Sequence, residues 1–228
     1  MSPRLAGAPL SLDARLLEAD LRRRIRGEVR FDDGSRALYA TDASSYRHVP
    51  IGVVVPRTVA DVVEAVAAAR EAGAPLTMRG GGTSLAGQCC NVAVVIDCSK
   101  YLNRVVELDP GKRFARVQPG CVLDDLRDEA LRHSLTFAPD PSTHTHCTLG
   151  GMIGNNSCGV HSITGGNTVD NIHELDVLTA DGLRLRVGPT SPEELDAIVA
   201  AGGRRGQIYA GLRDLRDRYA DLIRARYP

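Results

Sequence analysis

The sequence predicts a mixed α/β or α+β protein that is built in two lobes. Short apolar runs alternate with amphipathic helical segments from Ile51 onward, and two pairs of strand-like runs are joined by turn dipeptides. A long polar stretch then separates the first elements from the last strands and helices. Of the 228 residues, 43% are hydrophobic and 25% are charged, which is the composition of a soluble globular protein.

The N-terminal region is expected to contain one helix. Residues 12–26 carry leucine and isoleucine at helical spacing, and Ser11 is the expected cap of this helix. The arginines between Arg22 and Arg26 form a dense basic spot, which we expect to be a solvated helix face. Residues 32–50 lack a periodic pattern and are expected to form a loop with short turns.

The pattern becomes regular after this loop. Residues 51–55 form an apolar run that is typical of a buried strand and ends at Pro56. The next segment is an amphipathic helix with Thr58 as its N-cap and Gly73 as its C-terminal stop. Two further strands, one on either side of a glycine-rich loop, are expected at 75–78 and 92–98.

Two hairpins, three helices and one long loop complete the expected fold. Pro110-Gly111 and Asp181-Gly182 are turn dipeptides between apolar runs, so each predicts a hairpin. The stretch 137–171 is dense in Gly, Asn, Ser and Thr, and loops of this length are usually functional or disordered. Hairpin strands are expected at 105–109, 114–120, 174–180 and 183–187, and helices at 121–135, about 191–201 and 206–226.

The most informative stretch is the glycine loop TMRGGGTSLAGQ, residues 77–88. Glycine lets the backbone adopt positive φ and approach a ligand closely, and successive amide groups in such a turn form an anion-binding concavity. The hydroxyls of Thr83 and Ser84 add further donors, and Arg79 precedes the glycines. Together these features indicate a cradle for a diphosphate group.

The glycine loop matches neither of the two common phosphate-binding motifs. A Walker A motif ends in Gly-Lys-Ser/Thr, but no lysine follows these glycines. A Rossmann motif would have its third glycine where Leu85 stands. A tight surface turn is the remaining alternative, although three consecutive glycines after a strand make it the weaker one.

The sequence resembles the FAD-linked oxidases of the p-cresol methylhydroxylase and vanillyl-alcohol oxidase type, nearest the branch of D-lactate, glycolate and D-2-hydroxyglutarate dehydrogenases. The resemblance covers residues 38–187 and implies an α+β fold, namely the α/β two-lobed FAD-binding domain of this type, with FAD between the lobes. It rests on four collinear motifs: ALYATDASSYRHVPIGVVVPRTVADVVEAV, PLTMRGGGTSLAGQ, VIDCSKYLNRVVELDPGKRFARVQPGCVLDDL and FAPDPSTHTHCTLGGMIGNNSCGVHSITGGNTVDNIHELDVLTADG.

The resemblance also implies which residues contact FAD. Residues of the glycine loop would hold the diphosphate through backbone N–H groups, and residues of the long polar loop would lie near the phosphates and the isoalloxazine ring. Gly150 and Gly151 would open a helix whose N-terminal amides face the cofactor. The implied contacts are Arg79, Gly80, Gly81, Gly82, Thr83, Ser84, Leu85, Pro139, Asp140, Ser142, Gly150, Gly151, Asn155, Ser157, Gly159, Gly165, Asn171 and Ile172.

Further expectations concern how FAD is attached and how much of a typical family member's length the chain represents. Some members bind FAD covalently through a histidine in or beside the loop, but here Thr83 follows the glycines, so FAD is expected to be non-covalent. Because members continue into a cap domain, the chain is expected to be an N-terminal fragment, and an iron–sulfur cluster is implied only for a longer parent chain. We expect a helical lead-in at 1–37, a first FAD-binding lobe at 38–140 and an incomplete second lobe at 141–228.

By the same resemblance, the expected reaction is the oxidation of a small D-2-hydroxy acid to the 2-oxo acid, with hydride transfer to FAD. No residue of the chain is assigned a catalytic role, and the electron acceptor is unknown. One alternative is a non-catalytic FAD- or nucleotide-binding module. Another is the NADPH-dependent reductase of cell-wall precursors, which shares the fold.

Histidines and cysteines outside the glycine loop offer weaker candidate sites. His144, His146 and Cys147 are residue types that zinc accepts, but no fourth ligand has suitable spacing, so no metal is expected. His161 could orient a substrate or take a proton, but a hydrogen-bonded loop histidine is the better interpretation. The six cysteines form no CxxC pair and are expected to be reduced thiols in a cytoplasmic protein.

Charge and aromatic content argue against nucleic acid as a partner. The chain has 28 basic and 28 acidic residues, lacks tryptophan and is 4% aromatic, so neither phosphate attraction nor base stacking is favoured. No apolar run is long enough to span a bilayer, while docking at the inner membrane through segments outside the chain stays open. An unpaired sheet edge would favour self-association, so a homo-oligomer is one expectation.

Overall fold

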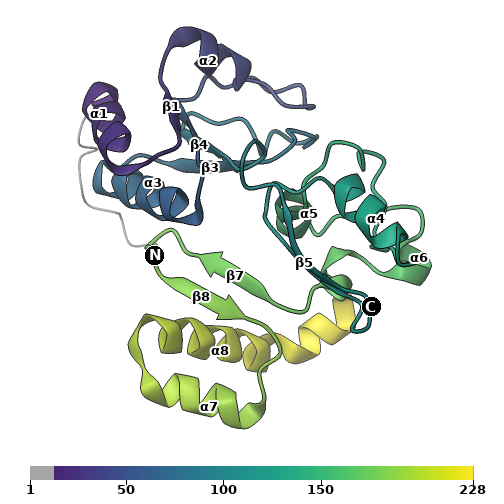
Figure 1. The fold of residues 1–228 in the computed structure, drawn as a ribbon. Helices are drawn as coiled ribbons and strands as arrows, with labels where there is room; N and C mark the ends of the chain where they lie inside the picture. The colour runs from purple at the N-terminus through teal and green to yellow at the C-terminus, as the bar shows by residue number, and fades with distance from the viewer. Residues whose placement is uncertain (1–12, 228) are drawn as a thin grey trace. The chain divides into compact units, whose positions relative to one another are not determined.

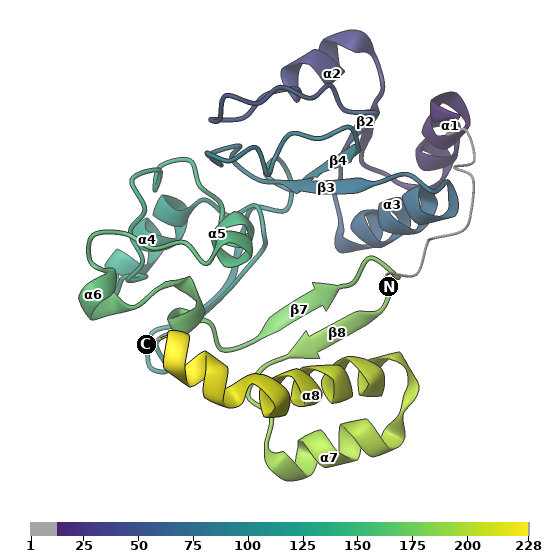
Figure 2. The same cartoon turned by 180° about the vertical axis from the view of Figure 1, so that it is seen from behind.

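The computed structural model describes residues 13–227, and the chain divides into two compact units, Met1–Ile172 and His173–Pro228. Both units contain helices and strands (Figures 1 and 2), which confirms the mixed fold class. The expected lobe boundary after residue 140 falls inside the first unit. None of the helices described between residues 13 and 227 is both long and apolar enough to cross a membrane.

The first unit contains a four-stranded sheet with the strand order β1-β2-β4-β3. β2 (Gly52–Val55) and β3 (Leu76–Arg79) each pair in parallel with β4 (Val94–Asp97), which lies between them. All residues of β2 and β4 are buried, which explains why both are continuous apolar runs. The crossover from β2 to β3 runs through α3 (Val59–Glu71), and β3 leads directly into the glycine loop.

Two short elements lie where the sequence showed no regular pattern. β1 (Glu28–Arg30) pairs antiparallel with β2, and α2 (Asp33–Leu38) follows it. Asp32 caps α2 by accepting the N–H of Ser35 at 2.8 Å. The prediction of a loop over residues 32–50 is therefore wrong for α2, because a helix of six residues is too short to show a helical period.

The first helix, α1 (Ala14–Arg24), starts later than expected. Asp13 caps it by accepting the N–H groups of Arg15 at 2.9 Å and Leu16 at 3.2 Å. The expected cap, Ser11, lies outside the described residues. An aspartate at this position is as good an N-cap as serine, so the residue type alone did not fix where the helix begins.

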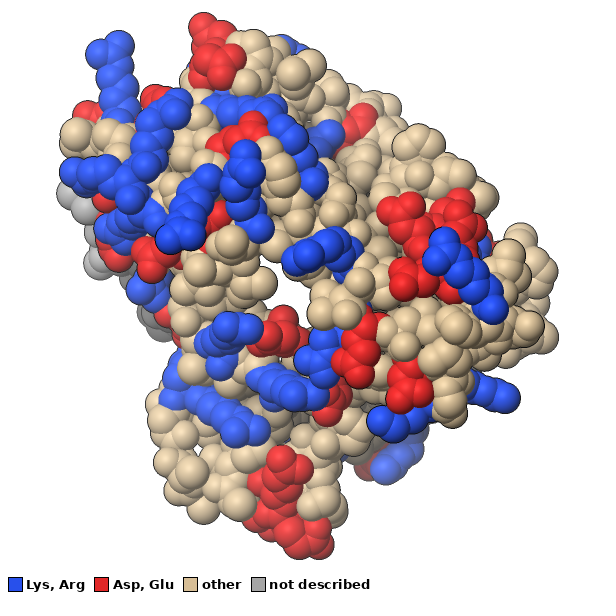
Figure 3. Space-filling view, in the orientation of Figure 1, with Lys and Arg blue, Asp and Glu red and all other residues tan. Residues whose placement is uncertain are grey.

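The basic spot at the end of α1 is a set of surface ion pairs. Arg22 pairs with Glu18 at 2.8 Å, and Arg24 pairs with Asp20 at 2.9 Å and with Glu71 of α3 at 2.5 Å. Figure 3 shows basic side chains gathered over this part of the molecule, with acidic ones among them. Exposed pairs such as that of Arg22 contribute little to stability, so the interpretation as a solvated helix face is confirmed for Arg22. It is wrong for Arg24, whose half-buried side chain joins α1 to α3.

Asp61 joins the start of α3 to the chain that follows α1. It is 4% exposed, and its carboxylate accepts the backbone N–H groups of Arg26 at 3.0 Å, Arg57 at 2.8 Å and Thr58 at 3.1 Å. Thr58 accepts the N–H of Asp61 in return, so a capping box forms and Thr58 is confirmed as the N-cap. Burial alone would raise the pKa of Asp61, but these donors outweigh it and lower the pKa.

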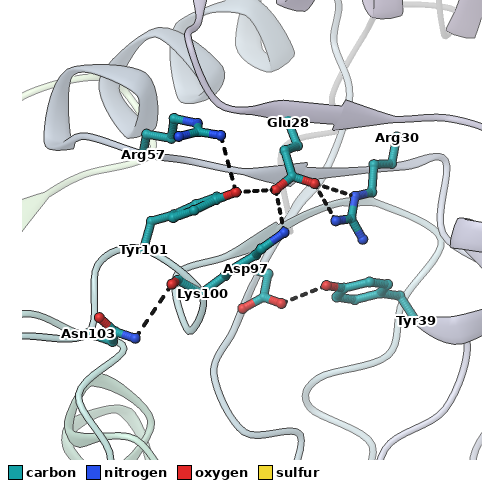
Figure 4. Close-up of polar contacts among 8 residues, drawn as sticks. All are labelled: Glu28, Arg30, Tyr39, Arg57, Asp97, Lys100, Tyr101 and Asn103. Atoms are coloured by element: carbon teal, nitrogen blue, oxygen red, sulfur yellow. Dashed lines mark hydrogen bonds and ion pairs between the residues drawn. The ribbon is translucent and has the colours of Figure 1, made fainter.

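A second charged cluster ties β1 to the segment after β4 (Figure 4). Glu28 accepts hydrogen bonds from Lys100 at 2.6 Å and from the hydroxyl of Tyr101 at 2.5 Å, and it also pairs with Arg30. These donors, with Lys100 first, lower the pKa of Glu28 to about 2, so the carboxylate is ionised at neutral pH. The guanidinium of Arg57 covers the ring of Tyr101 at 4.5 Å.

The remainder of the first unit packs around a second group of buried residues. β5 (Val105–Asp109) and β6 (Phe114–Val117) form the expected hairpin, and α4 (Leu123–Leu131) contacts β5. The long polar stretch forms regular structure, namely α5 (Leu149–Asn155), α6 (Ser162–Gly165) and the 3-10 turn Thr168–Asn171. The buried residues of this group are Cys121, Leu123, Leu126, Cys147, Leu149 and Met152.

The second unit consists of one hairpin and two helices. β7 (Leu175–Leu178) pairs antiparallel with β8 (Arg184–Val187), and α7 (Pro192–Ala201) precedes α8 (Gly203–Arg226). α8 begins at Gly203, not at residue 206 as expected. Gly206 has a packing role instead, because a Cβ added there would lie 2.9 Å from the carbonyl oxygen of Ile198 in α7.

We predict that Asp61→Asn lowers the free energy of unfolding by about 2–4 kcal/mol at pH 7, because an amide cannot accept from three N–H groups as a carboxylate does. The lowered pKa means that this stabilisation is present above about pH 4, the ordinary value, and is lost as the pH falls through the folded-state pKa. Urea unfolding of the variant and the wild-type protein at pH 7 and pH 3 measures both effects.

The matched control for this prediction is Asp33→Asn. The side chain of Asp33 is 99% exposed and lies in the first turn of α2, so its variant should stay within about 0.5 kcal/mol of the wild-type protein. Equal losses for the two variants would show that Asp61 does not join α3 to the chain after α1.

Candidate cofactor-binding site

A cavity of about 610 Å³ lies in the first unit, where the glycine loop meets the start of α5. Its volume is within the range of roughly 300–1,000 Å³ that is usual for small-molecule sites. None of the described residues that line it is a carboxylate. The predicted cofactor contacts that line it are Arg79, Gly80, Gly81, Gly82, Thr83, Ser84, Leu85, Gly150, Gly151, Asn155 and Ser157.

Two glycines let the glycine loop touch the segment before α5. A Cβ added at Gly80 would lie 2.0 Å from the hydroxyl oxygen of Thr148. A Cβ added at Gly81 would lie 2.1 Å from the carbonyl oxygen of His146. Since both distances are far below van der Waals contact, any side chain at these positions would separate the two segments.

Six consecutive backbone amides of the glycine loop are unpaired. From Gly80 to Leu85, no N–H donates to an acceptor within residues 13–227. The next amide, that of Ala86, donates to Oε1 of Gln88 at 3.2 Å, which marks the end of the unpaired run. Gly82 has a positive φ of 66°, the conformation that turns successive amides toward one concavity. Such a run of free donors fits an anion such as a diphosphate.

Arg79 lies beneath this run of amides. Its Nη1 donates to the carbonyl oxygen of Cys89 at 3.3 Å, and its guanidinium covers the ring of Tyr39 at 5.3 Å. A Cβ added at Gly82 would lie 2.7 Å from Nη2 of Arg79, so the turn passes directly over the guanidinium. The side chain thus braces the loop and places a positive charge close to its free donors.

The far end of the glycine loop is held by Asp42 and Cys89. Asp42 Oδ2 accepts the N–H of Cys89 at 3.3 Å, and Oδ1 accepts the N–H of Ser44 at 2.9 Å. Burial would raise the pKa of Asp42, but the hydrogen bonds from Ser44 and Cys89 and the charge of Arg79 lower it. The thiol of Cys89 lies 3.0 Å from the hydroxyl of Ser84, so that hydroxyl already has a partner.

α5 starts where the resemblance implied, but its first backbone N–H groups already donate hydrogen bonds within the chain. Thr148 is the N-cap and accepts the N–H of Gly151 at 3.4 Å. The N–H of Leu149 donates to the carbonyl of Cys121 at 2.8 Å, and that of Gly150 to the carbonyl of Pro119 at 2.9 Å. The prediction that these amides face the cofactor is therefore wrong. Gly150 and Gly151 offer the cavity a surface without side chains instead.

Gln88 is a residue of the cavity that sequence reasoning missed. Its Nε2 donates to Oδ1 of Asn155 at 3.2 Å, and Nδ2 of Asn155 donates to the carbonyl of Gly151 at 3.0 Å. Together with the bond from Ala86, these contacts link the glycine loop to α5 across the cavity. Gln88 ends the glycine-loop motif, but nothing in the pattern indicated its partner.

The other predicted contacts lie outside the lining of the cavity. Asp140 accepts a hydrogen bond at 2.5 Å from Nδ1 of His161, and this bond lowers the pKa of Asp140. Nδ2 of Asn171 donates to the carbonyl of Gly165 at 2.8 Å. Predicted contacts that do not line the cavity are Pro139, Asp140, Ser142, Gly159, Gly165, Asn171 and Ile172.

The residues considered as zinc ligands have other partners. Nδ1 of His144 lies 2.7 Å from Asp124, and Nδ1 of His146 lies 2.6 Å from the hydroxyl of Thr145. Cys147 is buried. Within the described chain, no three His, Cys, Asp or Glu side chains are grouped so that they could hold a metal ion.

Three thiols line the cavity, and burial keeps two of them protonated. All six cysteines of the chain are free thiols. Burial raises the pKa of Cys98 to about 12 and also raises that of Cys147, while Cys89 is half-buried. Because neutral thiols do not repel an anion, the cavity wall stays compatible with a diphosphate beside the free amides of the glycine loop.

A family model described as an FAD binding domain matches residues 50–188. The chain belongs to the FAD-binding domain family. The matched range contains the glycine loop, α5 and the β7–β8 hairpin, so the family resemblance is confirmed and FAD is supported as the cofactor.

Two relatives indicate the branch of the family. The chain is 35% identical over 224 residues to a D-2-hydroxyglutarate dehydrogenase of Pseudomonas putida. The aligned region covers 97% of this chain and 22% of that protein. It is 32% identical over 189 residues to the glycolate oxidase subunit GlcD of Escherichia coli. Here the aligned region covers 81% of this chain and 38% of that protein. The chain therefore spans less than half the length of either relative.

Solved structures agree with this assignment at the level of the fold. An alkyldihydroxyacetonephosphate synthase matches with a TM-score of 0.68 over 81% of this chain and 40% of that chain. The sequences are 19% identical, so the match shows a shared fold.

We predict that Gly81→Ala destabilises the first unit by about 1–3 kcal/mol, because its Cβ would press on the carbonyl of His146 and the backbone would have to shift. FAD binding should weaken in parallel, since the loop would move away from the wall. Urea unfolding and flavin fluorescence titration measure the two effects. Gly111→Ala is the control: its Cβ would lie 3.4 Å from Asp109, so both quantities should stay near wild-type values. Equal effects of both substitutions would contradict the prediction.

Proposed function

We propose that the protein is the FAD-binding part of a flavin-dependent oxidoreductase that oxidises a D-2-hydroxy acid, of the lactate, glycolate or 2-hydroxyglutarate type, to the 2-oxo acid. The observation that carries the proposal is the run of unpaired amides from Gly80 to Leu85 along a cavity in a chain of the FAD-binding domain family. The names of the relatives support this substrate class, since they act on hydroxyglutarate and glycolate.

In this proposal the glycine loop binds the diphosphate of FAD, and Arg79 adds positive charge from behind. Bound FAD supplies the acceptor for the hydride that leaves the hydroxy acid. The hydroxyl of Thr83 is one more donor at the cavity, and the surface of Gly150 and Gly151 admits the cofactor close to the backbone of α5. Because the loop lacks histidine, the attachment is non-covalent.

The proposal also covers the residues that flank the cavity. The contact of Asp140 with His161 fixes the loop before α5 relative to the segment after it, and both segments belong to the proposed FAD site. We also propose that the chain is organised as a helical lead-in followed by two FAD-binding lobes, residues 38–140 and 141–228. The proposed further contacts with FAD are Pro139, Asp140, Ser142, Gly159, Gly165, Asn171 and Ile172.

The chain by itself is proposed to bind FAD and not to turn over substrate. The described residues that line the cavity include no histidine and no carboxylate, so none is suited to take the proton of the substrate hydroxyl at neutral pH. The chain spans 22% and 38% of the length of these two relatives, and the substrate-binding groups are proposed to lie outside the residues that line this cavity. The same observation favours the second candidate, a non-catalytic FAD-binding module.

We predict that the purified chain retains flavin absorption bands after incubation with FAD and desalting, and that acid precipitation releases the flavin. The whole oxidoreductase of which this chain is proposed to be the FAD-binding part should lose the bands under anaerobic conditions when a D-2-hydroxy acid is added, and not when the L enantiomer is added. A chain that retains no FAD would contradict the cofactor site. An intact protein that retains FAD but is reduced by neither enantiomer would favour the non-catalytic module.

A further inference from the structure

The three glycines of α5 differ in what surrounds them. A Cβ added at Gly150 would lie 2.8 Å from Pro119, and one added at Gly151 would lie 3.3 Å from the hydroxyl of Thr148. Packing therefore explains the glycine at 150 and in part the one at 151. A Cβ added at Gly154 would meet no atom within 4 Å, so packing of the chain gives no reason for a glycine there.

Backbone conformation gives no reason for this glycine either. Gly154 is helical and does not have a positive φ. The left-handed residue that ends α5 is Asn156, with φ 46° and ψ 52°. Glycine in a helix is less favourable than alanine because it loses more backbone freedom on folding, so the fold alone would favour a side chain at position 154.

The feature of Gly154 that is left to consider is its place in the lining of the cavity. Gly151 and Gly154 are three residues apart on one helix and so lie on the same face. A Cβ at position 154 would meet no atom of the chain, so only a bound cofactor could be in its way. The hydrogen bond from Gln88 to Asn155 joins the two walls between which that cofactor would lie.

We propose that Gly154 is a cofactor-contact position, kept free of a side chain so that bound FAD can lie directly against the backbone of α5. The inference rests on the proposed FAD site and adds a residue to it that the family resemblance did not assign. In this proposal Gly154 contributes by having no side chain, whereas the amides of the glycine loop contribute by donating hydrogen bonds.

The chain offers a matched control for this proposal. Gly211 is also helical, in α8, and a Cβ added there would likewise meet no atom within 4 Å. It does not line the cavity. Substitutions at 154 and 211 thus add the same atoms to a helix without a Cβ clash, and they differ in whether the substituted residue lines the proposed site.

The test compares Gly154→Ala and Gly154→Leu with Gly211→Ala and Gly211→Leu in the full chain. Thermal unfolding of the FAD-free proteins is followed by circular dichroism, and FAD affinity is measured by flavin fluorescence titration. Both alanine variants should unfold at the wild-type temperature or about 1–4 °C above it. The Kd for FAD should rise several-fold for Gly154→Ala and more than about tenfold for Gly154→Leu, while the Gly211 variants bind like the wild-type protein.

Three other outcomes would overturn the proposal, and they are distinguishable. If the wild-type chain binds FAD and Gly154→Leu binds it equally well, Gly154 is no contact and the FAD site stands without it. If the Gly154 variants lose thermal stability as well as affinity, the glycine serves the fold. If the wild-type chain binds no FAD, the proposed cofactor site of this chain fails, and the role of Gly154 fails with it.

Discussion

The structure depends on one close approach, between the glycine loop and the segment that precedes α5. Gly80 and Gly81 pass so near to Thr148 and to the carbonyl of His146 that no side chain fits between them. The loop amides from Gly80 to Leu85 have no acceptor among the described residues. The contact therefore forms a wall of the cavity that these free donors also line.

The rest of the first unit holds this contact in place. The buried strands β2 and β4 fix the position of β3, which leads into the glycine loop. Tyr39, whose ring lies beside Arg79, donates its hydroxyl to Asp97 at the end of β4 at 2.7 Å (Figure 4). The opposite segment is anchored by backbone hydrogen bonds of 2.8 and 3.1 Å between residues 121–123 and 147–149. The charges around the cavity also suit an anion, since the guanidinium of Arg79 lies near the amides and none of the described lining residues is a carboxylate.

Elements with a strong local signal were predicted well from the sequence. β2 is a continuous apolar run, and α3 carries a capping threonine and a glycine at its end, so both were correctly placed. β1 was missed because its three residues gain regular structure only by pairing with β2, which is a tertiary contact. α2 was missed because its 6 residues are too few to show a helical period. The cap of α1 was misplaced because two residues near its start, Ser11 and Asp13, are of capping type.

The candidate site was predictable in its motifs but not in its hydrogen bonds. Glycines and hydroxyls identified the loop, but the hydrogen bonds from the first amides of α5 to the carbonyls of Cys121 and Pro119 are tertiary contacts that no local pattern indicates. The partner of Gln88 lies 67 residues away, at Asn155, so no local pattern could indicate it. Likewise, sequence alone cannot separate a glycine that packing requires, such as Gly150, from one that packing leaves free, such as Gly154.

The central claim is that the unpaired amides of the glycine loop hold the diphosphate of FAD. Hydrogen–deuterium exchange of the free chain and of the chain saturated with FAD tests it most directly. Amides from Gly80 to Leu85 have no protecting acceptor in the described chain, so they should exchange fast when free and distinctly more slowly with FAD, while α8 stays unchanged. Equal exchange of these amides at full flavin occupancy would contradict the claim and would place the diphosphate elsewhere.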